Sequence, residues 1–163
     1  MSGFSLLILT IGIPGSGKSR WVSRYKKENP TTFIISTDAL RKEITGVEQC
    51  IDPSQNKMIH DEARKRVKDI INDPNSKGHG LGPVIIVDST NCNVSEWIQY
   101  KELGATIMIA KVFETDPDTA MKYQQLRERQ VPREIVEMKW KELKENEKYL
   151  RFIFNMIDYI PKD

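Results

Sequence analysis

The chain has 163 residues, with 25 Lys and Arg against 23 Asp and Glu, so its formal net charge is only +2. This length predicts a single domain over residues 1–163, large enough to bury a core of its own. The balanced charge argues against a general nucleic-acid coat, and no apolar run approaches the ~18 residues of a transmembrane helix. Two cysteines and two histidines, all far apart, argue against a disulfide framework and a zinc site. We therefore expect a soluble, cytoplasmic protein.

Strand-like and helix-like segments alternate from the N-terminus onward. The segments with the short apolar or β-branched composition of strands are residues 4–11, 32–36, 84–87, 105–113 and 156–160. The helices expected between them cover residues 18–27, a short stretch from residue 39, and residues 54–72, 93–103, 117–131 and 132–154. This alternation predicts an α/β fold of three layers, in which a parallel sheet carries helices on both faces.

Helix starts and buried helix faces can also be assigned from residue type and spacing. The expected N-terminal caps are Thr37 or Asp38, Ser54, Asn93 with Glu96, and Asp116 with Pro117. The expected apolar stripe of helix 54–72 is Met58, Ala63, Val67, Ile70 and Ile71. The expected apolar positions after Pro132 include Ile135, Met138, Leu143 and Leu150.

A phosphate-binding loop follows the first expected strand directly and opens the first helix. Residues 12–19 match G-x-x-x-x-G-K-[ST], a pattern in which glycines let backbone amides approach a polyphosphate and the helix adds its dipole. In this pattern the lysine bridges the β- and γ-phosphates and the serine hydroxyl ligates Mg²⁺. The residues expected to hold ATP or another NTP are Gly12, Pro14, Gly15, Ser16, Gly17, Lys18 and Ser19. We favour this reading over a chance Gly-rich turn.

Carboxylates follow two other expected strands and should lie beside this loop, because ligands bind at the carboxyl ends of parallel strands. Asp38 is the candidate base for a hydroxyl that accepts a phosphoryl group, and Arg41 could hold that carboxylate or bind an acceptor phosphate. Asp38 could equally be a plain helix cap. Asp88 is a candidate to order Mg²⁺ through water. Thr90 and Asn91 either contact the acceptor or merely turn the chain before the next helix.

A basic segment with the character of a lid lies at about residues 122–134. Arg127 and Arg129 are candidates to neutralise charge on the transferred phosphoryl group, a role worth roughly 10³–10⁵ in rate where it has been measured. The alternative is a solvated basic face.

Four motifs taken together resemble the polynucleotide 5′-hydroxyl kinases, including the kinase modules of the bacteriophage enzyme and of bacterial RNA-repair enzymes. They are the loop at 12–19, D-x-x-R at 38–41, D-x-T-N at 88–91, and R-x-V-P at 129–132 before a long helix. The resemblance spans nearly the whole chain. It implies a P-loop kinase fold with the first strand central in the sheet.

The same resemblance implies roles for individual residues. Asp38 would be the general base, Arg41 would contact the acceptor's phosphate with support from Asp88, and a lid arginine would contact the donor phosphates. The Asn-x-x-Arg that often precedes the lid motif is replaced by Tyr123 and Leu126, with Arg127 one place along.

The leading hypothesis is therefore a Mg²⁺-dependent kinase that moves the γ-phosphate of ATP to a 5′-hydroxyl of single-stranded or end-exposed RNA or DNA. The alternatives are a kinase of a small-molecule hydroxyl and a non-catalytic ATP-binding switch. Two further features are consistent with nucleic-acid binding, and each has an alternative interpretation, as solvent-exposed surface or as core. They are a basic cluster (His60, Arg64, Lys65, Arg66, Lys68) and three aromatic residues able to stack on bases (Trp21, Tyr25, Trp97). Lys77 and His79, in the loop 73–83, are weaker candidates for substrate contact than for a surface insertion.

Overall fold

A five-stranded parallel sheet in the order β2-β3-β1-β4-β5 forms the centre of the molecule. The structure is a computed structural model that describes residues 3–48, 52–76, 80, 82–128 and 130–161. The strands are β1 (Leu6–Ile11), β2 (Phe33–Ser36), β3 (Val84–Asp88), β4 (Ile107–Phe113) and β5 (Met156–Ile160). The predicted α/β class and the central place of the first strand are confirmed.

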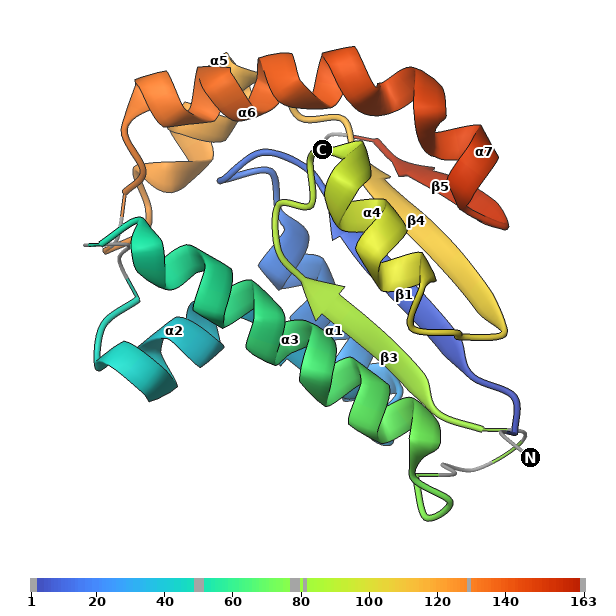
Figure 1. Cartoon of the computed structure of the whole chain (residues 1–163). Helices are drawn as coiled ribbons and strands as arrows, with labels where there is room; N and C mark the ends of the chain where they lie inside the picture. The colour runs from blue at the N-terminus through green and yellow to red at the C-terminus, as the bar shows by residue number, and fades with distance from the viewer. Residues whose placement is uncertain (1–2, 49–51, 77–79, 81, 129, 162–163) are drawn as a thin grey trace.

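Helices cover both faces of the sheet and one of its ends (Figure 1). They are α1 (Lys18–Glu28), α2 (Thr37–Thr45), α3 (Ser54–Asn72), α4 (Val94–Lys101), α5 (Pro117–Gln124), α6 (Arg133–Asn146), the 3-10 turn η1 (Glu147–Tyr149) and α7 (Leu150–Ile153). One face packs against α3, α4 and α7, and the other packs against α1. The helices α5 and α6 form a separate apolar contact with the P-loop at Ile13.

The alternation of side chains along β1 explains why a continuous apolar run is needed there. Leu7, Leu9 and Ile11 enter the large core beneath α3 and α4. Ile8 points the other way and packs with Val22 of α1. A central parallel strand is buried on both faces, so its positions are apolar. The exception in β1 is Thr10, whose buried hydroxyl bonds to the Val87 and Ser89 carbonyls.

The capping prediction succeeded at two helices and failed at two others. Asn93 accepts from the Glu96 amide and Asp116 from the Thr119 amide, as expected. At α2, however, the cap is Ser36, whose Oγ accepts from the Ala39 amide at 3.2 Å, so Asp38 is not a cap. At α3 the Ser54 side chain makes no capping bond. Instead, Asp52 accepts from the Ser54 amide, and Asp52 thus orders the turn before the helix.

Two apolar stripes also differ from their predictions. On α3 the buried positions are Ile59, Ala63, Val67 and Ile71, and Met58 is exposed. On α6 the buried positions are Val136 and Leu143, whereas Ile135 and Met138 are exposed. Met58 and Ile59 are adjacent in α3, as are Ile135 and Val136 in α6, and spacing alone did not show which of each pair faces the protein interior.

The aromatic residues considered for base stacking belong to packed clusters. Trp97 is fully buried against Phe154, and its indole N–H donates to the Asn91 carbonyl at 2.6 Å. Trp21 stacks on Tyr25 with ring centroids 5.3 Å apart beside α1's apolar contact with the sheet. Trp97 is therefore a core residue, and Trp21 and Tyr25 are half-buried residues that pack against the contact between α1 and the sheet.

Residues 73–76, which follow α3, lie at the opposite edge of the sheet from the P-loop (Figure 1). Lys77 and His79 fall outside the described residues, so their predicted substrate contact is not described. Among the helices of the described residues, none has the length and apolar character to cross a membrane.

Truncating a central core side chain tests this packing. Leu9→Ala should lower the free energy of unfolding by about 2–5 kcal/mol, because Leu9 is fully buried in β1 and leaves a cavity. Leu126→Ala is the matched control, since that leucine is 92% exposed and should change stability by less than about 0.5 kcal/mol. Urea denaturation measures both, and equal losses would contradict the packing described.

Candidate functional site: a P-loop with two carboxylates

The carboxyl ends of β1, β2 and β3 meet at one edge of the sheet, and each leads into polar residues. Ser36 at the end of β2 pairs in register with Asp88 at the end of β3. The P-loop follows β1 between β3 and β4. The sequence prediction that the P-loop, Asp38 and Asp88 share an edge is thus confirmed by the strand register.

The P-loop has the backbone that an anion cradle needs. Gly15 and Gly17 have φ of 83° and 93°, a region that L side chains rarely adopt. A Cβ on Gly15 would also lie 2.6 Å from the Ala120 carbonyl oxygen of α5. The loop is therefore shaped by glycine and packed directly against the helix that begins the lid.

Lys18 is buried and folds back over the loop. Its Nζ donates to the Ile13 carbonyl at 2.7 Å and to Ser16 Oγ at 3.3 Å. Burial lowers its pKa to about 8, although the charges of Asp88 and Asp38 oppose that shift. A bound polyphosphate would place negative charge beside this desolvated ammonium and would stabilise its protonated form.

Ser19 and Asp88 form the pair of oxygens expected of a Mg²⁺ site. The Ser19 hydroxyl donates to Asp88 Oδ2 at 3.1 Å, and Ser19 is exposed at the mouth of the loop. Burial raises the pKa of Asp88, with Lys18 acting in the opposite direction. A hydroxyl and a carboxylate fit Mg²⁺, which takes few protein ligands and fills its shell with water and substrate phosphates.

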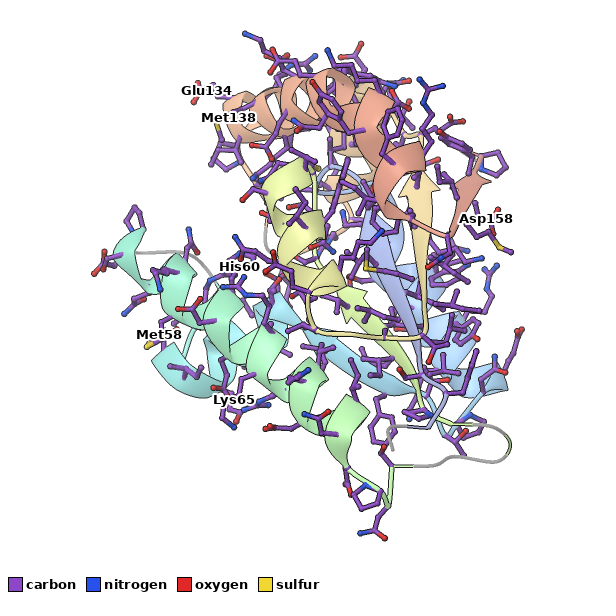
Figure 2. The ribbon with its side chains drawn as sticks, turned by 45° about the vertical axis from the view of Figure 1, so that its right-hand side comes forward. Met58, His60, Lys65, Glu134, Met138 and Asp158 are labelled. Carbon is purple, nitrogen blue, oxygen red and sulfur yellow. The ribbon has the colours of Figure 1, made fainter. Side chains whose placement is uncertain are left out.

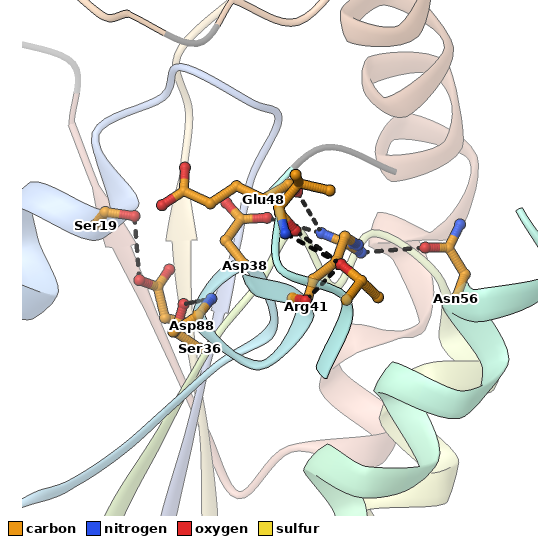
Figure 3. Close-up of polar contacts among 10 residues, drawn as sticks. Ser19, Ser36, Asp38, Arg41, Glu48, Asn56 and Asp88 are labelled. Carbon is orange, nitrogen blue, oxygen red and sulfur yellow. Dashed lines mark hydrogen bonds and ion pairs between the residues drawn. The ribbon is translucent and has the colours of Figure 1, made fainter. Parts of the chain in front are cut away.

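Asp38 and Arg41 lie on the first turns of α2, facing the Ser19–Asp88 pair (Figure 3). Arg41 Nη1 donates to Asp38 Oδ1 at 3.0 Å, and the side chains are 9% and 44% exposed, respectively. Nη2 donates to Asn56 Oδ1 at 3.1 Å, and Nη1 also reaches the Glu48 carbonyl. Arg41 Nε is buried without a partner among the described residues. The pair thus joins an accessible carboxylate to a guanidinium whose position is fixed by several hydrogen bonds.

The D-x-T-N segment, residues 88–91, is hydrogen-bonded to the end of β1 and to the start of the P-loop. Gly12 donates its amide to the Thr90 carbonyl at 3.0 Å. Asn91 is fully buried, has φ of 46°, and donates from Nδ2 to the Thr10 carbonyl at 2.9 Å. The expected contact between the Asn91 side chain and a substrate does not fit this burial, because the amide points into the protein. The geometry of Asn91 fits the alternative interpretation, in which this residue turns the chain before the next helix.

The lid comprises the end of α5, the turn after it and the start of α6. Gln124 is fully buried, and its Oε1 accepts from the Val131 amide at 2.7 Å, which ties the two sides of the turn together. Arg127 is exposed, and its charge acts on both Lys18 and Asp88, so it lies on the P-loop side of the turn. Arg129 falls outside the described residues.

Four contributors were missed from the sequence. Thr10 Oγ1 donates to the Val87 and Ser89 carbonyls, and Thr115 Oγ1 donates to the Ser16 carbonyl. Asn56 holds Arg41 from α3, and Gln124 backs Gly15. Polar residues inside or just after apolar strands could have signalled the two threonines. No local pattern distinguishes Asn56 or Gln124, since their partners are distant or lie across a turn.

Comparison with models of known protein families shows to which family this chain belongs. Residues 7–149 match the model of a family described as AAA domain. The chain belongs to this family. The AAA domain match contains the P-loop and both carboxylates, so it covers every described element of the site. No curated protein matches the chain in sequence.

Solved structures show the same fold at low sequence identity. A chain of the Pnkp1/Rnl/Hen1 RNA repair complex is 19% identical with a TM-score of 0.69, over 91% of this chain and 46% of that chain. A gluconokinase from Sinorhizobium meliloti 1021 is 15% identical with a TM-score of 0.62, over 95% and 81%. A second Pnkp1/Rnl/Hen1 structure is 22% identical with a TM-score of 0.60, over 80% and 42%. This AAA domain therefore has a P-loop kinase fold, which implies nucleotide binding, and it spans less than half of the RNA-repair chains.

The pKa of Lys18 predicts how nucleotide affinity depends on pH. The free protein loses the Lys18 proton at about pH 8, whereas bound phosphate should hold that proton. ATP affinity should therefore be constant up to about pH 7.5 and should fall as pH rises through 8 toward 9.5. Calorimetric titration across this range measures it. Lys18→Arg keeps its charge, so its affinity should not change with pH, and an equally steep decline in that variant would contradict the assignment.

Proposed function

We propose that this protein is an ATP-dependent kinase whose acceptor is the 5′-hydroxyl of a polynucleotide. The observation that carries the proposal is the Asp38–Arg41 pair, which faces the Ser19–Asp88 pair across the mouth of the P-loop (Figure 3). One pair suits a donor phosphate with its metal, and the other suits a hydroxyl with a neighbouring anion. Two such pairs at one sheet edge support transfer between two bound molecules.

Asp38 serves as the general base in this proposal. Phosphoryl transfer needs the acceptor oxygen oriented and its proton taken up as the new P–O bond forms and the bond to the leaving ADP breaks. The Asp38 side chain is accessible, and its ion pair with Arg41 fixes the orientation of the carboxylate. Three donors of Arg41 are used by Asp38, Glu48 and Asn56, and in this proposal the guanidinium also binds an anionic group of the acceptor.

Positive groups surround the place where charge would develop. Lys18 and the loop amides bind the donor phosphates, and Arg127 contributes from the lid, with Arg129 proposed for the same role. Ser19 and Asp88 would hold Mg²⁺, which when bound neutralises charge on the donor phosphates. Thr90 lies beside Asp88 and stays a proposed contact of the acceptor.

A kinase of a small-molecule hydroxyl is the second candidate, because the gluconokinase matches this chain over most of both lengths. Asp38 would act in the same way, and Arg41 would bind the acceptor's carboxylate or phosphate. A non-catalytic ATP switch leaves the Asp38–Arg41 pair without a use, so we do not favour it.

An acceptor panel separates these functions. Labelled ATP is supplied with a 5′-hydroxyl oligoribonucleotide, a 5′-hydroxyl oligodeoxyribonucleotide, gluconate and several sugars and nucleosides. Label on an oligonucleotide is the expected result. Label on gluconate or a sugar alone would replace the proposal with the second candidate, and binding of ATP without transfer would favour the switch.

Removing the proposed base should separate binding from transfer. Asp38→Asn keeps the size and polarity of the side chain but cannot accept the proton. We expect kcat to fall about 10²–10⁴-fold, with ATP affinity unchanged. Full activity in this variant would show that Asp38 is not the base, and Lys18→Ala, which should lose activity together with ATP binding, is the comparison.

Removing the proposed metal carboxylate should change the Mg²⁺ requirement. Asp88→Asn should shift the Mg²⁺ concentration for half-maximal activity upward by about tenfold or more, because an anionic ligand is lost. Glu102→Gln is the control, since Glu102 is an exposed acid just after α4. An unchanged Mg²⁺ dependence in Asp88→Asn would contradict this site.

A further inference from the structure

A row of polar side chains extends along α3 from the acceptor side of the site. Asn56, His60 and Arg64 are spaced four residues apart, so they share one face of the helix at intervals of one turn, about 5.4 Å. Asn56 accepts from Arg41 at 3.1 Å, which joins the start of the row to the Asp38–Arg41 pair. His60 and Arg64 therefore continue along α3 from the guanidinium that the proposed function gives to the acceptor.

The row faces the helix that follows the lid. Figure 2 shows His60 on the side of α3 toward α4 and α6, and Lys65 on the opposite side of the helix. The side chains of Arg64 and Lys139 are only 20% and 25% exposed. Lys139 belongs to α6 and acts electrostatically on His60. Cations from α2, α3 and α6 thus surround one half-buried imidazole.

Carboxylates in this region offset only part of that charge. Asp61 pairs with Arg64 and Lys57, and Glu142 lies 3.4 Å from Lys139. Glu96 of α4 also acts on Lys139 and Arg64. Burial lowers the pKa of His60, and Arg64, Arg41 and Lys139 lower it further, whereas Asp61 raises it. The net field at His60 is therefore positive. Among the residues that the structure describes, His60 makes no hydrogen bond or ion pair.

We propose that His60, together with Arg64 and Lys139, forms a second anion subsite, which binds the next phosphate of an acceptor strand whose first phosphate lies at Arg41. This inference rests on the proposed function and narrows it. A neutral sugar has no anionic group and gluconate has one, so either acceptor would leave the second subsite unused. The site therefore selects an acceptor with successive phosphodiesters, and His60 is a specificity-determining residue.

A pH dependence follows from the same geometry. A neutral imidazole can donate one hydrogen bond to a phosphate, and a protonated one can donate two and adds a charge. A bound phosphate offsets the field of Arg41, Arg64 and Lys139, so the pKa of His60 should rise on binding. Strand affinity should accordingly increase as pH falls below the ordinary histidine value, with uptake of a proton.

Steady-state kinetics with acceptors of different length tests the subsite. His60→Asn should raise KM about tenfold for a 5′-hydroxyl trinucleotide, which is the size of a lost charge-assisted hydrogen bond, and leave kcat unchanged. The KM for a nucleoside 3′-monophosphate, which has one phosphate, should not change. Lys65→Ala is the matched control on the opposite side of α3, where the side chain is 66% exposed, and should match the wild type.

Proton NMR supplies a readout that does not depend on catalysis. The chain has two histidines, His60 and His79, so His79→Asn leaves one imidazole signal to titrate. Without ATP, the trinucleotide should raise the pKa of that signal, and gluconate and a sugar monophosphate should not.

The outcomes separate this inference from the proposed function. Kinase activity on the trinucleotide with no effect of His60→Asn and no response of the imidazole would overturn the subsite and leave the function intact. A response of the imidazole to the trinucleotide without phosphorylation would support the subsite and overturn the function. A response to the sugar monophosphate equal to that of the trinucleotide would overturn the selection for a strand.

Discussion

The site depends on the hydrogen bonds that tie the P-loop to the end of β3. Gly12 donates to the Thr90 carbonyl, and the buried Asn91 amide donates to the Thr10 carbonyl at the end of β1. These bonds hold together two segments that lie far apart in the chain, with 81 positions between Thr10 and Asn91. Because Asp88 lies just before this junction, its distance from Ser19 is set by the backbone.

Two buried cations divide the proposed reaction between them. Lys18 is held by a carbonyl and a hydroxyl, and burial lowers its pKa, so it gains most from a polyphosphate that restores its charge. Arg41 donates three hydrogen bonds, to a carboxylate, a backbone carbonyl and a side-chain amide oxygen, and these bonds fix the plane of its guanidinium. The first group is thus suited to bind the donor and the second to orient the acceptor and its base.

Sequence reasoning was accurate where a local pattern has one physical solution. The P-loop pattern, the buried strands and the caps at Asn93 and Asp116 needed no distant partner, and the structure confirms them. It was wrong where neighbouring residues compete. Ser36 rather than Asp38 caps α2, and Ile59 rather than Met58 is buried in α3. In these cases the direction of the incoming strand and the packing partner decide between adjacent positions.

The sequence by itself determined that this chain is an α/β domain with a nucleotide-binding loop, because strand periodicity and glycine spacing are local properties. The tertiary structure decided which polar residues share a site. It placed Asp38 and Arg41 opposite Ser19 and Asp88 and turned Asn91 inward (Figure 3). It also brought α3 and α6 together around His60. These relations follow from strand order and helix packing, which bring residues distant in the chain within reach of one another.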